Sequence, residues 1–273
     1  MGLDPIGYKP WTGKRTEHNR RFLIIAQNIV LDKLRSKSFL FMYILGMFLV
    51  HVFPLIFHSM MSHDVLEADL MSGYMQDMVF LIFNIILVSL ICADLVSEDM
   101  RSNSIVLYLS RALQPDRYLL GKWLGAVVTL ALFTLIPPLA VSIAVTATQG
   151  GGDYLASLGV IGRTVLAGSF AALFLVPVGM MMSAITSKRT YAGVGTFMFF
   201  FILVIVSMVL SGFSADWEML SPINVLSDSY DVLYGITLSS DVNTALMALM
   251  IVVLTVPPMW FVYQRIVRKG VGK

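Results

Sequence analysis

The sequence predicts an all-α membrane protein with six transmembrane helices, and two observations carry that prediction. Only 13% of the 273 residues are charged and 57% are hydrophobic, whereas about 25% of the residues in a soluble domain are charged. Mean hydropathy is +0.80. Six apolar stretches are also long enough for a helix to cross a hydrocarbon core of about 30 Å. These features exclude an ordinary soluble enzyme, a disordered chain and a free nucleic-acid binder.

The first predicted element is an amphipathic helix at the end of an N-terminal segment, residues 1–38. Apolar residues recur near helical spacing from Phe22 to Val30, and basic side chains surround this stripe. The basic residues assigned to the helix are Arg20, Arg21, Lys33 and Arg35. We expect the helix to lie in the headgroup layer of the membrane, with its long basic side chains at lipid phosphates. The alternative is a plain cytoplasmic extension of the first span.

Six stretches form the predicted transmembrane domain, residues 39–264. They occupy residues 39–57, 78–93, 123–152, 164–187, 190–215 and 242–264. Each stretch can cross the bilayer as a helix, because a helix satisfies its own backbone hydrogen bonds. Pro137-Pro138, Pro177 and Pro257-Pro258 fall deep in the third, fourth and sixth stretches. We expect kinks at these positions, because proline removes a backbone hydrogen-bond donor.

The basic residues predict the orientation of the spans, because lysine and arginine favour the cytoplasmic side of a membrane. The segments 1–38, 94–122, 188–189 and 265–273 together hold 18 of the 19 lysine and arginine residues. We therefore expect a plasma-membrane protein with both termini in the cytoplasm and with residues 265–273 as a cytoplasmic tail. Arg163, near the outer end of the fourth span, is the exception.

Common catalytic and cofactor motifs are absent from the sequence. There is no GxxxxGK[ST] phosphate loop, no GxGxxG and no HExxH. A single cysteine, Cys92, permits neither an internal disulfide nor a thiolate zinc cluster. Few ionisable side chains fall in the middle of the spans, which disfavours a carrier driven by protons or sodium. We expect a chain that is not an enzyme, has no catalytic residues and binds no metal or cofactor.

Residues 94–122, between spans two and three, carry the most informative pattern. Ser97 is suited to cap a helix, and Glu98 and Asp99 would complement the positive end of the helix dipole. An apolar ridge follows, made of Ile105, Val106 and Leu109. Residues 113–116 then break the helix before the third span. The pattern predicts a short amphipathic helix across the cytoplasmic mouth, and the alternative is a solvated connecting loop.

Several short motifs follow one another in this segment. They are Asp94, Ser97-Glu98-Asp99, Arg101-Ser102-Asn103-Ser104-Ile105, Leu109-Ser110-Arg111 and Tyr118-Leu119-Leu120-Gly121-Lys122. Their order, together with six spans and a basic N-terminal helix, resembles the membrane permease of ATP-binding-cassette (ABC) transporters of the type-2, exporter-like class. Asn103 stands where this family commonly has glycine, and Ala112 where it commonly has proline. Asparagine tolerates the left-handed backbone that glycine usually supplies.

The resemblance implies that a separate ATPase subunit binds ATP and Mg²⁺. Two such subunits would dock beneath a permease homodimer or heterodimer, each on a coupling helix of residues 97–111. The residues expected to contact the ATPase are Ser97, Glu98, Asp99, Arg101, Ser102, Asn103, Ile105, Leu109 and Arg111. The resemblance also implies short re-entrant helices within residues 213–243, between spans five and six. Membrane lipid is a further expected partner, and nucleic acid is not.

These expectations predict a permease subunit that exports an amphipathic or lipid-like solute with ATP hydrolysed by its partner. The first alternative is an ATP-independent secondary carrier or channel, which the scarcity of mid-membrane charge and the docking-like inner helix disfavour. The second is an intramembrane enzyme or an assembly factor, which would need paired His, Asp or Ser/Lys groups at depth. The spacing of Gly121 and Gly125 permits a close helix approach without identifying the neighbouring helix.

Overall fold

The structure, a computed structural model, describes residues 20–53, 56, 67–110, 113–149, 154–238 and 243–270. The regular elements in these ranges are all helices, as the sequence predicted. In chain order they are α1 (Arg21–Arg35), α2 (Lys37–Gly46), η1 (Met47–Val52), α4 (Glu67–Gln76), α5 (Met78–Cys92), α6 (Ser97–Arg101), α7 (Ser104–Ser110), α8 (Pro115–Thr134), α9 (Ile136–Gln149), α10 (Tyr154–Ile185), α11 (Arg189–Leu210), η2 (Ala215–Leu220), α12 (Pro222–Tyr234) and α13 (Thr244–Gly270).

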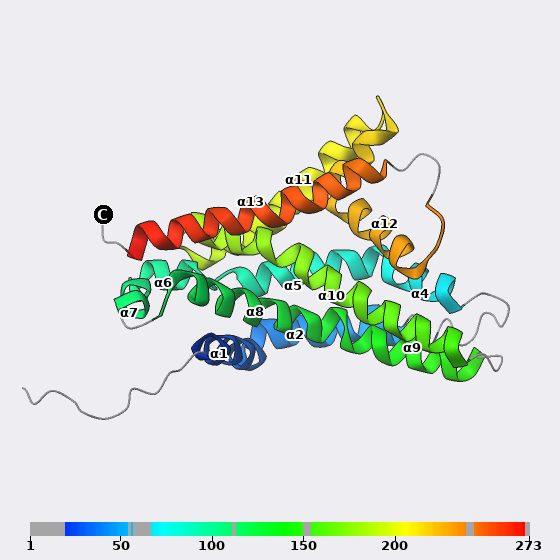
Figure 1. Ribbon diagram of the computed structural model, residues 1–273, viewed down its shortest axis with the longest axis horizontal. Helices are drawn as coiled ribbons and strands as arrows, with labels where there is room; N and C mark the ends of the chain where they lie inside the picture. Colours follow the sequence, from blue (N-terminus) through cyan, green and yellow to red (C-terminus); the bar gives the residue numbers. More distant parts are fainter. Residues whose placement is uncertain are drawn as a thin grey trace, which may run out of the picture.

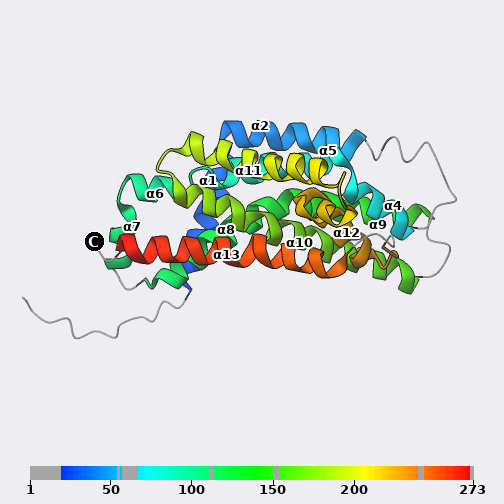
Figure 2. The same cartoon turned by 90° about the horizontal axis from the view of Figure 1, so that it is seen from above.

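The long helices lie alongside one another, and shorter helices gather at the two ends of the bundle (Figure 1). α6, α7 and the C-terminal end of α13 lie at one end, with α1 crossing the bundle close by. α4, α9 and α12 lie towards the opposite end, and Figure 2 shows the same separation from above. We call these the α6 end and the α12 end.

Five helical stretches are long and apolar enough to cross a membrane. They are Met78–Arg101, Pro115–Ala147, Ser157–Ile185, Arg189–Leu210 and Thr244–Lys269. A sixth candidate combines α1 with α2 and η1, but these parts are bent by 77°. The bend falls at Ser36, so the N-terminal helix predicted from the sequence is a separate element, and α2 with η1 covers most of the first predicted span.

The prolines for which kinks were predicted differ in their effect on helix continuity. Span three does break, at Leu135, just before the pair Pro137-Pro138, so that α8 and α9 are separate helices. Pro177 and the pair Pro257-Pro258 instead lie inside the uninterrupted helices α10 and α13. A proline in these helices therefore does not interrupt them.

Glycines on α8 let α1 lie directly against it. A Cβ atom at Gly121 would lie 2.8 Å from the Phe22 carbonyl oxygen, and one at Gly125 would lie 2.9 Å from Ile29 Cβ. Distances below 3.0 Å require the neighbouring atoms to shift. Gly121 and Gly125 therefore allow α1 to pack closely against the third span of the same chain.

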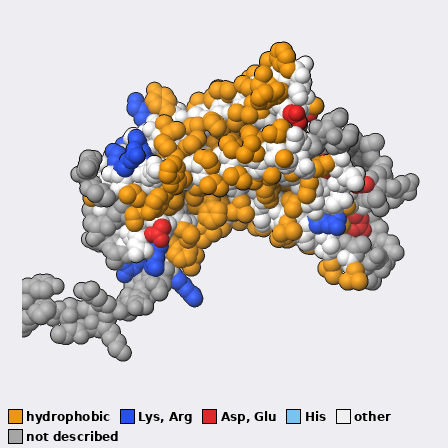
Figure 3. Space-filling model, turned by 45° about the horizontal axis from the view of Figure 1, so that its top comes forward, with side chains coloured by type: hydrophobic (Ala, Val, Ile, Leu, Met, Phe, Trp, Pro, Cys, Tyr) orange, Lys and Arg blue, Asp and Glu red, His pale blue; other side chains and the backbone are white. Residues whose placement is uncertain are grey.

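An apolar surface covers the middle of the bundle. Figure 3 shows hydrophobic side chains over most of the visible face, with most of the basic side chains at one end. α11 and α13 expose many apolar side chains. Among them are Val194, Met198, Phe201, Ile202, Val252, Val256 and Trp260. Soluble monomers rarely expose apolar patches larger than a few hundred Å². The exterior therefore suits contact with lipid.

Helices η2 and α12 occupy the connection between spans five and six, where short helices were predicted. α12 packs against α4 and α10. Arg163 of α10 donates a hydrogen bond from Nη1 to the Tyr234 carbonyl oxygen in the last turn of α12. Gly235 then ends the helix in the left-handed conformation, with φ 78°. A cation stabilises a helix C-terminus, which gives a structural role to the one basic residue that departs from the orientation pattern.

Candidate functional site

The connection between α5 and α8 contains two short helices rather than one. α6 and α7 meet at Ser102 and Asn103, and Asn103 adopts a φ of 56°. Asparagine is among the few residues that tolerate this left-handed region, as the comparison with glycine at this position predicted. The single helix predicted over residues 97–111 is wrong, because the left-handed residue interrupts it. α8 begins at Pro115, as expected from the helix break predicted at residues 113–116.

Buried hydrogen bonds fix α6 to the bundle. Ser183 Oγ of α10 accepts hydrogen bonds from the backbone N–H groups of Val96 and Ser97, at 3.0 and 3.1 Å. Ser97 is fully buried, and its Oγ donates to the Ala93 carbonyl oxygen at 2.7 Å. Ser97 does not cap α6 as predicted, because Val96 is the N-cap residue and the Ser97 hydroxyl bonds to the preceding turn. Ser97 therefore anchors α6 and faces away from any partner.

The carboxylate of Asp99 is enclosed by groups of its own chain. Asp99 Oδ2 lies 2.7 Å from Lys122 Nζ and accepts a hydrogen bond from the Tyr118 hydroxyl. Asp99 Oδ1 accepts a hydrogen bond from Ser104 Oγ at 3.0 Å. The side chains of the ion pair are each 13% exposed. Asp99 therefore joins α6, α7 and α8, and its carboxylate is occupied within the chain.

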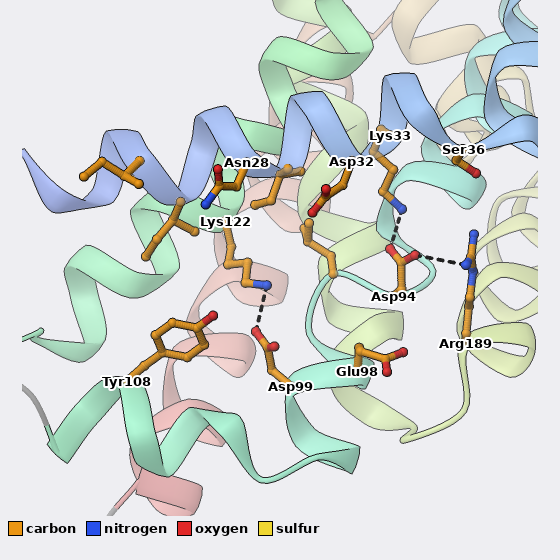
Figure 4. Close-up of a pocket in the computed structure, with 14 residues that line it drawn as sticks. Asn28, Asp32, Lys33, Ser36, Asp94, Glu98, Asp99, Tyr108, Lys122 and Arg189 are labelled. Atoms are coloured by element: carbon orange, nitrogen blue, oxygen red, sulfur yellow. Dashed lines mark hydrogen bonds and ion pairs between the residues drawn. The ribbon is translucent and has the colours of Figure 1, made fainter.

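A second ionic network joins α1 to the first turn of α11 (Figure 4). The Asp94 carboxylate pairs with Lys33 through Oδ1 and with Arg189 Nη1, 3.4 Å away, through Oδ2. Lys33 Nζ also donates to the Leu90 carbonyl oxygen at 3.1 Å. The expectation that Lys33 lies at lipid headgroups is wrong, because its side chain is only 7% exposed and faces the bundle.

A cleft of about 610 Å³ lies between α1 and the pair α6 and α7. Its charged lining residues are Asp32, Lys33, Asp94, Glu98, Asp99, Lys122 and Arg189. Figure 4 shows both ionic networks along this cleft, with Tyr108 of α7 beside them. Partial burial and the nearby Asp99 carboxylate raise the pKa of Tyr108, so its hydroxyl stays protonated at neutral pH. Asp32 is exposed and has no ion-pair partner among the residues that the structure describes.

Four of the residues predicted to contact an ATPase form an exposed surface beside the cleft. They are Glu98, Arg101, Ser102 and Asn103, which we call the α6 surface. Glu98 and Arg101 pair with each other, and 49% and 65% of their side chains are exposed. Such exposed pairs add little stability, so both charges remain available to a partner. On α1, Arg20 and Arg35 are exposed and Arg21 is half-buried.

The predicted apolar ridge of α7 is only partly at the surface. Ile105 is 2% exposed and belongs to the core, so its prediction as a partner contact is wrong. Val106, the next residue, is 44% exposed. The side chain of Leu109 and all of Arg111 lie outside the described residues.

Sequence reasoning did not identify the groups that hold this site together. Ser183 is a single hydroxyl in an apolar span, and Arg189 lies in a short basic connection. Their partners on α6 and in the turn before it are about ninety residues away in the chain. The sequence offered one indication of such pairing. It contains few charged residues, and a charge that is buried needs a partner. That signal does not say which charges pair.

A comparison with known families decides the assignment. A sequence model described as ABC-2 family transporter protein matches residues 23–269, from α1 to the end of α13. The chain belongs to the ABC-2 transporter family. No match was found among curated proteins.

As a member of the ABC-2 family, the chain is a multi-pass membrane component of an ABC transporter. The family implies an ABC ATPase as its partner. Within the described ranges, no three His, Cys, Asp or Glu side chains gather as a metal site would require. The α6 surface and the cleft beside α1 are therefore the candidate site of this ABC-2 permease.

Proposed function

We propose that an ATPase subunit docks on the α6 surface and drives this permease from the α6 end. One observation carries the proposal: α6 is exposed on one side and tied to membrane spans on the other. The backbone of Ser97 is bonded to Ser183 of α10, and Asp99 is paired with Lys122 of α8. A force on the exposed side would therefore move the spans as connected, fairly rigid bodies.

The proposed cycle places two ATPase subunits, with ATP and Mg²⁺, beneath a pair of permease chains. ATP drives the spans from an inward-facing to an outward-facing arrangement only if it binds the two arrangements with different affinity. The α6 end then lies in the cytoplasm with both termini, in keeping with the 18 of 19 basic residues in the segments predicted to be inside. The α12 end lies outside.

An amphipathic or lipid-like solute, moved outward, is the proposed substrate class. The exterior of the bundle is apolar, and the sequence contains 18 methionines and 17 phenylalanines. Methionine is flexible and polarizable, which suits adaptable contact with apolar groups. Few ionisable groups lie in the middle of the spans, so an apolar solute would meet little charge there.

Charge reversal on the α6 surface tests the docking proposal. The double variant Glu98→Lys with Arg101→Glu keeps an ion pair within α6 but reverses both charges that the partner meets. We expect co-purification of the ATPase to fall about tenfold, equivalent to ~1.4 kcal/mol of binding free energy, with solute-stimulated ATP hydrolysis falling in parallel.

The matched control is Glu218→Lys, because Glu218 is also exposed but lies on η2, between spans five and six. This variant should retain the ATPase. Normal co-purification and normal transport in the double variant would show that the ATPase docks elsewhere.

A further inference from the structure

Three changes in helical structure lie in or beside the first three spans, near the α12 end. Span one passes into the π-helix η1, which contains His51. Span two begins directly after Asp77, which separates it from α4 and whose carboxylate caps α5 by accepting hydrogen bonds from the N–H groups of Val79 and Phe80, at 2.9 and 3.2 Å. Span three breaks at Leu135, between α8 and α9. π-helical turns and proline are among the features at which helices change direction.

The three changes lie at one level of the bundle, around the imidazole of His51. The His51 ring centre lies 6.0 Å from that of Tyr74, 5.8 Å from that of Phe80 and 4.6 Å from that of Phe133. Tyr74 and Phe80 lie on either side of Asp77, where α4 ends and α5 begins. Phe133 stands two residues before the break in span three. One side chain from span one therefore packs beside both other changes.

Only one ring nitrogen of His51 is hydrogen-bonded to the residues that the structure describes. The side chain is 3% exposed, its Nδ1 is hydrogen-bonded to the Tyr74 hydroxyl, and its buried Nε2 has no partner among the described residues. A buried nitrogen without a partner destabilises the arrangement that contains it. π-helical turns are also frequent at functional sites. Both features set this contact apart from ordinary helix packing.

Beyond this level, α4 is attached sideways to α12. The Asp231 carboxylate of α12 accepts hydrogen bonds from Ser72, at 2.8 Å, and from Gln76. α12 is attached in turn to α10, where the Tyr234 hydroxyl lies 2.8 Å from Thr164 Oγ1. α10 and α13 pass the same level without a break. The changes in helical structure in spans one to three therefore lie beside the continuous helices α10 and α13, which we call the frame.

We propose that η1, α4 and α9 form a gate at the α12 end, and that the hydrogen bond between His51 and Tyr74 holds this gate closed. His51 acts as a positioning residue. It holds α4 through the hydrogen bond to Tyr74, and its ring packs against Phe80 of α5 and Phe133 of α8. The same three spans carry α1, α6 and α7 at the opposite end. The link from ATPase docking to gate movement rests on the proposed function, whereas the contact between His51 and Tyr74 does not.

The test measures the position of α4 relative to the frame, in the full-length chain in lipid nanodiscs without ATPase. Spin labels are attached at Gly73→Cys in α4 and Gly159→Cys in α10, where an added Cβ meets no heavy atom within 4 Å. A reference pair, Gly162→Cys and Leu249→Cys, joins the continuous helices α10 and α13. The native Cys92 is fully buried, so labels react at the introduced positions.

Tyr74→Phe removes one hydroxyl and keeps the ring. We expect a second distance population between α4 and α10 in this variant, and an unchanged distance for the reference pair. His51→Phe keeps a ring against Phe133 but removes both nitrogens, and it should produce the same second population.

The matched control is Tyr43→Phe, whose hydroxyl donates to the Leu132 carbonyl oxygen at 3.1 Å and links spans one and three without reaching α4. This variant should leave both distances unchanged. The proposal is overturned by a single, unchanged α4–α10 distance in Tyr74→Phe and His51→Phe, or by an equal change in Tyr43→Phe. Because no ATPase is present, neither result depends on where an ATPase docks.

Discussion

The first three spans differ from the last three in continuity. Span one changes from α-helix to π-helix at Met47, span two begins beside the separate helix α4, and span three has a one-residue break at Leu135. By contrast, α10, α11 and α13 continue over 32, 22 and 27 residues.

Proline alone does not explain the difference: Pro137-Pro138 follow the break in span three, but Pro177, Pro257 and Pro258 lie inside continuous helices. The boundary at Asp77 coincides with a side-chain cap, and the break at Leu135 lies beside Pro137-Pro138 and the aromatic contact of His51 with Phe133. Local caps and proline together with aromatic packing therefore mark these positions.

The two halves also differ in how they meet the α6 end. α1, α6 and α7 precede or connect spans one to three, so the surface proposed for the ATPase belongs to the first half. The continuous half reaches that end through Ser183 and Arg189, which contact the segment around Asp94. We infer that the continuous helices serve as a frame and that spans one to three move against it.

The largest expected change in stability comes from removing the Asp94 carboxylate, which pairs with Lys33 of α1 and with Arg189 of α11. Asp94→Asn leaves the buried Lys33 without its carboxylate partner, and removing one member of a buried pair costs on the order of 3 kcal/mol. We expect the free energy of unfolding in detergent to fall by about that amount. The control is Glu98→Gln, which removes one charge of an exposed pair and should change stability by less than about 1 kcal/mol. Equal losses in the two variants would mean that the Asp94 carboxylate is not the buried partner of Lys33.

A smaller effect is expected where the frame contacts the break in span three. A Cβ atom at Gly168 of α10 would lie 2.3 Å from the Thr134 carbonyl oxygen. Gly168→Ala should therefore force α10 away from this break and reduce the free energy of unfolding by about 2 kcal/mol.

Gly162→Ala in the same helix is the matched control, because its Cβ meets no heavy atom within 4 Å. Alanine is the better helix former there, by about 0.5–1 kcal/mol, so this variant should be as stable as the native chain or more stable. A loss of stability in Gly162→Ala as large as in Gly168→Ala would indicate a general intolerance of α10 and not a close contact with span three.

Features that depend on local composition were predictable from the sequence. The apolar stretches placed the spans, residues 113–116 placed the start of α8, and the family comparison anticipated the left-handed backbone of Asn103. Each depends on residues that are close together in the chain. Asp77 before an apolar run also carried a helix-start signal, but its significance becomes clear only when α4 is seen as a separate helix.

Features that depend on distant partners were not predictable. Lys33 and Asp99 are charged residues, which usually lie at the surface. In this fold they are buried because they pair with Asp94 and Lys122. Ile105 belongs to a short amphipathic pattern that does not specify which face meets the core. The π-helix around His51 has no sequence signal comparable to a cap or a proline. Tertiary packing decides all of these positions.

The measurement that tests the account most directly uses the permease together with its co-purified ATPase in nanodiscs. The label pairs in α4–α10 and in α10–α13 are followed before and after addition of ATP and Mg²⁺. The account predicts that nucleotide shifts the α4–α10 distance and leaves the α10–α13 distance unchanged. Continued ATP hydrolysis and solute transport with an unchanged α4–α10 distance would contradict it.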